Sequence, residues 1–475
     1  MIFAAADEAR YSELTMVNGP VEGKRVTVLG AARSGIAVAR LLKNNGARVY
    51  VSDAAPSDRL RPQIEALQSE QIEFETGRHS DRVYDADLLV LSPGVPTDST
   101  VVRQALRRGI RIVSELEAAS WFSRAPIVAV TGTNGKTTTT TLIGRIFSDA
   151  RRDHVVAGNI GTAFSGVADE LGADSVAVLE VSSFQLDYTE SFHPKVSIIL
   201  NITPDHLDRY NHDFSLYIAS KCRVFQQQTE EDVLIYNDDD DVIREQLRNR
   251  AGLRPRLLPF ARERRLEEGA FLDNGILVTV LGARKSEIIP AAEISIRGLH
   301  NLANAMAAAL AGQVLGVPVS SIRATLRNFK GVEHRLEFVR ELGGVSYVND
   351  SKATNVDSVW YALQSFAEPI VLLLGGRDKG NDYARLRDLI RSHVRAIVAI
   401  GESAGKVMES FEDLCPVVRA MSMDEAVQKA RELAKRGDAV LLSPACASFD
   451  WFENYEHRGR VFKEIVNSLD VQNDA

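Results

Sequence analysis

The 475-residue sequence predicts an α/β protein of three domains. Short apolar runs rich in β-branched residues alternate with longer amphipathic segments, a pattern typical of parallel sheets that helices cover on both faces. These runs fall into three blocks, and a chain of this length has room for about three domains of ordinary size. We expect the domains to span residues 1–114, 115–330 and 331–475.

The composition excludes several classes of protein. The chain has 56 basic and 64 acidic residues, and the net charge of −8 leaves no excess of positive charge for nucleic-acid phosphates. No apolar run approaches the roughly 18 residues that a membrane helix needs. The cysteines Cys222, Cys415 and Cys446 have neither a disulfide nor a zinc-binding spacing. We therefore expect a cytoplasmic protein that binds neither nucleic acid nor membranes.

The first block has the pattern of a Rossmann-like domain, with strands expected over 25–30, 48–53 and 87–92. Gly30-Ala-Ala-Arg-Ser-Gly35 follows a strand and opens a helix, and Asp53 ends the next strand. Ala32 replaces the second glycine of the dinucleotide-binding fingerprint. The segment predicts either a phosphate- or nucleotide-sized ligand or simply a tight strand-to-helix turn. Ser92 and Gly94 would line the same crevice.

A phosphate-binding loop opens the second block, where Thr131-Gly-Thr-Asn-Gly-Lys-Thr137 lies between a buried strand and a helix predicted from Thr138 onward. Glycines permit a tight turn, so that backbone N–H groups can point at phosphate oxygens, while Lys136 adds positive charge and the Thr137 hydroxyl can hold Mg²⁺. Val130 stands where the common pattern has its first glycine. We interpret the loop as an ATP site; the alternative is a glycine-rich turn with a surface lysine. The residues assigned to the ATP phosphates are Gly132, Thr133, Asn134, Gly135, Lys136 and Thr137.

Polar residues follow the neighbouring strands of this block. Glu180 ends one expected strand, and Asp205 and His206 follow another. Ligands of open α/β sheets bind beyond the carboxyl ends of the strands, where these groups could hold a divalent metal beside the phosphates. Taken singly, Glu180 could be an ordinary strand-end charge and Asp205 a helix cap. The metal site is therefore predicted from their joint position.

Three further features of the second block have simpler interpretations. The spacing identifies Lys221, inside a predicted helix, as an ordinary surface lysine. Asn301 and Asn304 lie at the start of an Ala-rich helix, where they could cap the helix or read a base edge, and the sequence slightly favours capping. Residues 261–293 mix charges and glycines, and we expect a hairpin region there.

The third block adds three motifs. His334-Arg335 precedes a strand, Asp350-Ser-Lys-Ala-Thr-Asn355 follows it, and Ser443-Pro-Ala-Cys-Ala-Ser448 follows the last strand. With these motifs the sequence closely resembles the Mur ligase family over about residues 20–470. The phosphate loop and His-Arg are shared across that family. The other two motifs are similar to its D-glutamate-adding members in particular.

The resemblance implies a fold, a reaction and its partners. It implies a Rossmann-like N-terminal domain that binds a UDP-substrate, a central P-loop mononucleotide-binding domain and a Rossmann-like C-terminal domain that binds the amino acid. The implied activity is the ligation of D-glutamate to UDP-N-acetylmuramoyl-L-alanine in peptidoglycan precursor synthesis. It would use ATP and two Mg²⁺ ions and pass through an acyl phosphate. We expect the protein to act as a monomer.

The resemblance also implies a role for individual residues. Thr137, Glu180, His206 and a carbamylated Lys221 would hold Mg²⁺. Asn301 and Asn304 would contact adenine, and Arg335, Asp350 and Lys352 the rest of ATP. The residues expected to meet the UDP-substrate are Arg33, Ser34, Asp53, Ser92, Gly94 and Asn159, and those for D-glutamate are Thr354, Lys379, Ser448, Phe449 and Tyr455. The catalytic set would be Lys136, His206, Lys221, Arg335 and Lys352.

Two other classes of function compete with this interpretation. An NAD(P)-dependent oxidoreductase could be built on Gly30–Gly35, but it would leave the Lys136 loop without a purpose. A non-catalytic nucleotide-binding regulator would not need the metal-binding residues beside that loop. Among enzymes, a sister Mur ligase or a folylpolyglutamate synthetase is the nearest rival, and Asp350–Asn355 disfavours both.

Overall fold

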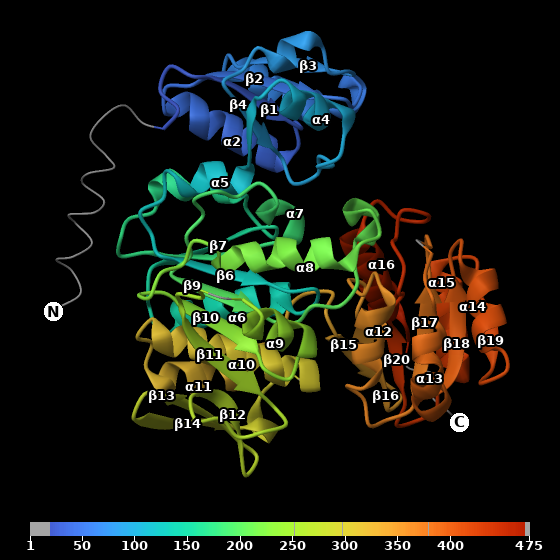
Figure 1. The fold of residues 1–475 in the computed structure, drawn as a ribbon. Helices are drawn as coiled ribbons and strands as arrows, with labels where there is room; N and C mark the ends of the chain where they lie inside the picture. The colour runs from blue at the N-terminus through green and yellow to red at the C-terminus, as the bar shows by residue number, and fades with distance from the viewer. Residues whose placement is uncertain (1–19, 251, 297, 379, 471–475) are drawn as a thin grey trace. The chain divides into compact units, whose positions relative to one another are not determined.

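The computed structural model describes residues 20–250, 252–296, 298–378 and 380–470, and it shows an α/β protein (Figure 1). Its strands form sheets of five, nine and six strands. The contacts divide the chain into two compact units, with the first sheet and most of the second in one and the third sheet in the other. The predicted fold class is confirmed. No helix in the described ranges has both the length and the apolar surface needed to cross a bilayer.

The first sheet has five parallel strands. They are β1 (Arg25–Leu29), β2 (Arg48–Asp53), β3 (Glu73–Thr76), β4 (Leu88–Leu91) and β5 (Arg111–Ser114), and the helices are α2 (Arg33–Asn44), α3 (Arg61–Ser69), α4 (Thr100–Arg107) and α5 (Glu115–Ser120). The strand order is β3-β2-β1-β4-β5, with β1 in the middle. Val26 and Val28 of β1 share a core with Val38 and Leu42 of α2. This central strand with crossovers to both sides is the Rossmann-like arrangement that the sequence predicted.

The second sheet is the largest. Its strands are β6 (Ile127–Thr131), β7 (His154–Gly158), β8 (Val176–Glu180), β9 (Val196–Ile199), β10 (Val233–Asn237), β11 (Arg256–Ala261), β12 (Gly269–Asp273), β13 (Ile276–Leu281) and β14 (Arg284–Pro290). Its helices are α6 (Lys136–Asp149), α7 (Ser183–Leu186), α8 (Phe214–Cys222), α9 (Asp241–Arg248), α10 (Leu299–Val314) and α11 (Val319–Asn328). The order is β14-β13-β12-β11-β10-β9-β6-β8-β7, and β6 pairs in parallel with β8 and β9. The carboxyl ends of these three strands therefore face the same edge.

The predicted hairpin region within residues 261–293 is confirmed. Strands β12, β13 and β14 are neighbours in the sheet and are joined by two-residue turns. The first turn is Asn274-Gly275, where φ is 50° and 77°. Both residues take the left-handed conformation that a tight type I′ hairpin turn requires, which explains the Asn-Gly pair.

The third sheet is parallel except at one edge. Its strands are β15 (Glu337–Leu342), β16 (Val345–Asn349), β17 (Ile370–Gly375), β18 (Val394–Ile400), β19 (Val417–Arg419) and β20 (Ala439–Leu442), and its helices are α12 (Val356–Leu363), α13 (Arg387–His393), α14 (Ala404–Phe411), α15 (Met423–Leu433) and α16 (Tyr455–Ser468). The order is β15-β16-β20-β17-β18-β19, with β15 antiparallel to β16. Leu372 and Leu374 of β17 belong to one apolar cluster, and Val371 and Leu373 belong to another. Both faces of the sheet are covered, so its strands read as continuous apolar runs.

Candidate functional site

The phosphate loop connects β6 to α6, as the sequence predicted, although the helix begins at Lys136, two residues earlier than expected. Gly132 has φ 148°, and Gly135, the residue that caps α6, has φ 87°. Both values favour glycine. A Cβ atom on Gly132 would also lie 3.1 Å from the Leu200 Cβ. The glycines are therefore required for the backbone path that directs N–H groups toward a bound phosphate.

Asn201, which follows β9, holds this loop in place. Its side-chain oxygen accepts a hydrogen bond from the Asn134 N–H at 2.8 Å, and its amide donates to the Asn134 carbonyl at 2.9 Å. Its own carbonyl accepts from the Thr133 N–H at 2.9 Å. No sequence motif predicts a role for Asn201. The available signal was its position at the carboxyl end of the strand beside β6.

Two lysines meet at one carbonyl of the loop. Lys136 Nζ donates to the Gly132 and Thr133 carbonyls at 2.9 and 2.8 Å, and Lys221 Nζ donates to the same Gly132 carbonyl at 2.8 Å. Lys221 is only 1% exposed, so the expectation of a surface lysine is wrong. Helix periodicity could not show that the Lys221 face of α8 packs against the loop. Burial, and next the charge of Lys136, lower the pKa of Lys221 well below its usual value, although Asp205 and Glu180 oppose this.

Glu180, at the end of β8, is buried beside the first residues of α6. Its carboxylate accepts hydrogen bonds from the Thr137 hydroxyl at 2.6 Å and from the Asn159 amide at 3.0 Å. The structure thus brings two predicted metal ligands together. A hydroxyl and a carboxylate are the hard oxygen donors that Mg²⁺ prefers, so these residues fit the ion. Asn159, expected at the substrate, contacts Glu180 here.

His206 is an exposed residue in the loop that follows β9. Its backbone has φ 51°, its side chain is 48% exposed, and its Nε2 is 3.8 Å from an Asp205 carboxylate oxygen. Asp205 also accepts a hydrogen bond from the His206 N–H at 2.9 Å. Among the described residues, one group of three His, Cys or acidic side chains lies close enough together to share a metal, and it contains neither His206 nor Glu180. That group is Glu333, His334 and Glu337, whose two carboxylates pair with Lys463 at 2.6 and 2.9 Å.

The two amides predicted for the base lie in the first turns of α10. Asn304 donates to the Asn301 side-chain oxygen at 3.1 Å, and both residues are buried. They lie inside the helix, which begins at Leu299, so neither stands at its N-cap. Contact with adenine stays a prediction.

Arg335 and Asp350 are held by a turn with strained backbone. The residues on either side of Arg335, His334 and Leu336, have φ 65° and 42°. The Asp350 carboxylate accepts from the Leu336 N–H at 3.2 Å and from the Ser443 hydroxyl at 2.8 Å. Burial raises the pKa of Asp350 to about 6, against the opposing charge of Arg335. Arg335 Nε is buried and has no hydrogen-bond partner among the described residues. Buried polar groups are normally hydrogen-bonded, so this N–H group could donate to a bound anion.

The residues predicted for D-glutamate differ in exposure. Ser448 is buried, whereas Phe449 is 59% exposed. Tyr455 begins α16, and the centre of its ring is 5.3 Å from Lys352 Nζ. Thr354 is half-buried. Lys379 lies outside the described residues.

Two of the residues predicted to line a crevice of the first sheet lie beside the same strand-to-helix turn. Asp53 accepts hydrogen bonds from the Ala31 and Ala55 N–H groups at 2.6 and 2.7 Å, and Ser92 Oγ donates to the Gly30 carbonyl at 3.0 Å. Asp53 and Ser92 therefore both border the turn that follows β1. Arg33 and Gly94 are exposed, and Ser34 is half-buried.

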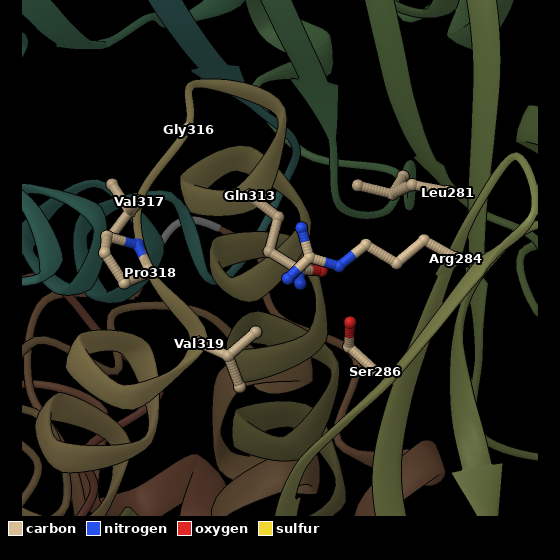
Figure 2. A pocket seen from close by; sticks show the side chains of 8 residues that line it. All are labelled: Leu281, Arg284, Ser286, Gln313, Gly316, Val317, Pro318 and Val319. Carbon is tan, nitrogen blue, oxygen red and sulfur yellow. The ribbon is translucent and has the colours of Figure 1, made fainter.

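A pocket of about 140 Å³ lies between the β13–β14 hairpin and the loop that joins α10 to α11 (Figure 2). It is lined by Leu281, Arg284, Ser286, Gln313, Gly316, Val317, Pro318 and Val319. Of the predicted site residues that the structure describes, none lines it, so this pocket is separate from the phosphate loop.

Comparisons with known families and structures agree with one another. The chain matches the Mur ligase MurD-like N-terminal domain over residues 24–114, the Mur ligase middle domain over 130–312 and the Mur ligase glutamate ligase domain over 334–446. The fold is similar to that of the UDP-N-acetylmuramate-alanine ligase of Thermotoga maritima, with a TM-score of 0.58, 19% identity and coverage of 94% of this chain and 99% of that one. A pseudomurein peptide ligase of Methanothermus fervidus has the same TM-score at 18% identity, with 94% and 100% covered.

Curated relatives match nearly the whole chain. The UDP-N-acetylmuramoylalanine–D-glutamate ligase of Salinibacter ruber is 50% identical over 96% of this chain and all of its own length. The protein of the same name from Chloroherpeton thalassium is 46% identical over the same shares. Because these matches span all three sheets and nearly the whole chain, the chain belongs to the Mur ligase family, in the group of its D-glutamate-adding members.

Proposed function

We propose that this protein joins D-glutamate to UDP-N-acetylmuramoyl-L-alanine and hydrolyses ATP to ADP and phosphate in doing so. The names of full-length relatives at 46–50% identity support the substrates. The observation that carries the proposal is the phosphate loop, which carries Lys136 and whose Thr137 hydroxyl donates a hydrogen bond to the buried carboxylate of Glu180. An oxidoreductase or a passive nucleotide sensor has no need of this combination.

The reaction would proceed in two steps. The alanyl carboxylate attacks the γ-phosphorus of ATP, and the bond from that phosphorus to the bridging oxygen breaks. ADP departs, and the substrate becomes an acyl phosphate. The amine of D-glutamate then attacks the acyl carbon, loses a proton and displaces inorganic phosphate. Negative charge gathers at the transferring group in both steps, and we assign Lys136, Arg335 and Lys352 to stabilise it.

Magnesium would be held first by Thr137 and Glu180. When bound, the ion neutralises phosphate charge and fixes the orientation of the phosphate chain. We assign His206 and Lys221 to a second ion. Lys221 can serve there because its buried amine has a strongly lowered pKa, and a neutral amine adds carbon dioxide to give a carbamate and a proton. A buried cation thereby becomes an anionic oxygen ligand.

The proposal includes a monomer that acts in the cytoplasm. The described cysteines Cys222, Cys415 and Cys446 are all unpaired thiols, which agrees with a reducing compartment. Size-exclusion chromatography of the purified protein tests the monomer.

The activity is tested with the purified full-length protein and a phosphate-release assay. We expect release from ATP that requires both UDP-N-acetylmuramoyl-L-alanine and D-glutamate. L-glutamate, L-lysine, meso-diaminopimelate and a folate serve as controls. Turnover with one of these in place of D-glutamate contradicts the proposed substrate.

The carbamate has a test of its own. Lys221→Ala should lose activity and regain part of it when a short-chain carboxylate such as acetate is added, since the carboxylate can replace the carbamate. Lys136→Ala is the matched control, because Lys136 donates to the same Gly132 carbonyl but is assigned to phosphate. Rescue of both variants, or of neither, contradicts the carbamate.

A further inference from the structure

Arg458, in the first turn of α16, is a buried cation to which the proposed reaction gives no role. Its side chain is among the largest that are fully buried, with only 1% exposed. Burial lowers its pKa to about 10, so the guanidinium stays charged at neutral pH. A buried charge is costly unless hydrogen bonds satisfy its donors, so the partners of Arg458 show what it holds.

The partners of Arg458 lie in two separate motifs. Nε donates to the Ser351 hydroxyl at 2.9 Å, and one terminal nitrogen donates to the Ser351 carbonyl at 2.7 Å. The other terminal nitrogen donates to the Cys446 carbonyl at 3.1 Å. Ser351 stands between Asp350 and Lys352, and Cys446 precedes Ser448 by two residues. One side chain thus joins the segment assigned to ATP to the segment assigned to D-glutamate.

Two neighbours on α16 extend this contact. The Tyr455 carbonyl accepts a hydrogen bond from the Ser351 hydroxyl at 2.9 Å. Gly459 lies directly against the imidazole of His334: a Cβ atom there would be 2.2 Å from its Nδ1. His334 precedes Arg335 in the chain. We call Tyr455, Arg458 and Gly459 the α16 anchor, because together they contact all three motifs of the third block.

We infer that Arg458 is a positioning residue, which sets the Asp350–Lys352 segment against the Ser443–Ser448 segment so that ATP and D-glutamate are bound in register. This role rests on the proposed function. A guanidinium suits it because its donors diverge in one rigid plane and can reach two backbone segments at once. A lysine ammonium carries the same charge at a single point and cannot span both.

Arg458→Lys tests the inference, since it keeps the charge and most of the length. We expect KM for ATP and KM for D-glutamate each to rise about tenfold or more, as small displacements of binding groups cost up to about 100-fold. KM for UDP-N-acetylmuramoyl-L-alanine should change less than about twofold, because the residues assigned to it lie outside both segments. Arg460→Lys, an exposed arginine one half-turn further along α16, is the matched control and should resemble wild type.

The outcomes separate positioning from support of the fold. A purely structural role lowers the melting temperature and the active fraction, so kcat falls while all three KM values stay unchanged, and that result overturns the inference. Wild-type behaviour of Arg458→Lys overturns it as well. If Arg458→Lys does not fold, Ser351→Ala removes only the hydroxyl contact and should raise the same two KM values by a smaller factor; unchanged values again overturn it. Wild-type protein is assayed first, and a lack of turnover there contradicts the proposed function.

Discussion

The phosphate loop and the C-terminal motifs are two ways of building a binding site. The loop, Thr131–Thr137, is one continuous segment whose shape follows from two glycines and the start of a helix. The C-terminal motifs are three segments far apart in the chain, and the α16 anchor holds them together. The first kind of site takes its backbone path from local residues, and distant residues such as Asn201 support that path. The second depends on long-range packing between segments that are distant in the chain.

Each of the two regions contains a buried basic side chain, and the two side chains differ in their hydrogen bonds and in their pKa shifts. Lys221 donates to one carbonyl beside a second lysine, and its pKa falls well below its usual value. Arg458 has three hydrogen bonds and keeps a pKa of about 10. An amine can shed its charge when it is buried, whereas a guanidinium keeps its charge and must be satisfied. The lysine is therefore suited to chemistry and the arginine to structure.

The largest effect is expected from Lys136→Ala, which breaks the local site. The variant removes the cation assigned to the transferring phosphate, and we expect kcat to fall about 100- to 1000-fold, as for the loss of one transition-state donor. The melting temperature should stay close to wild type, because Lys136 donates its hydrogen bonds to the Gly132 and Thr133 carbonyls within its own loop and joins no distant segments through them. A loss of activity of less than tenfold would contradict the assignment.

The second prediction concerns Asp350 in the C-terminal site. Its pKa is about 6 in the folded state and near 3.8 without the fold, so the folded state binds more protons between these values and wild-type stability falls as the pH rises from 4 to 6. Asp350→Asn cannot titrate. Its stability relative to wild type should rise by up to about 3 kcal/mol between pH 4 and pH 8 in melting experiments, at 1.36 kcal/mol per pKa unit.

Asp438 is the control for this prediction, since it is also a buried aspartate of the third sheet's unit. Burial raises the pKa of Asp438, but the hydrogen bonds from Arg395 and from the Lys435 N–H, together with the charges of both residues, lower it by more. The pKa is therefore lowered overall. Asp438→Asn should therefore show the opposite trend, with wild type gaining stability relative to the variant as the pH rises through the acidic range. The same trend in both variants would contradict the raised pKa of Asp350.

The smallest effect is expected from Gly459→Ala, which adds one methyl group within the α16 anchor. Alanine favours a helix over glycine, but its Cβ would meet the buried His334 ring, so we expect a net loss of about 1–2 kcal/mol. Gly405→Ala in α14 is the matched control: a Cβ there meets nothing within 4 Å, and the variant should be neutral or more stable. Thermal melting of both variants makes the comparison. A Gly459→Ala protein as stable as Gly405→Ala would show that His334 can move freely.

The sheets could be predicted from sequence patterns more easily than the contacts at the edges of the sheets. The buried strands of β6 and β17 are apolar on both faces, so they stand out as continuous runs, and the Asn274-Gly275 pair marks a hairpin turn. Lys221 and Asn201 could not be identified in this way. Each acts on a loop that is distant along the chain, and neither breaks the local pattern around it.

The sequence by itself determined the α/β class, the Rossmann-like first sheet and the strand–loop–helix that carries Lys136 and Thr137, because backbone propensity, glycine spacing and apolar periodicity act over a few residues. The tertiary structure alone decided that Lys221 is buried against Gly132, that Asn201 is hydrogen-bonded to the phosphate loop and that Arg458 joins two distant motifs. Those contacts depend on which helix face meets which strand end. Only the packed sheets, and no stretch of sequence read alone, fix that choice.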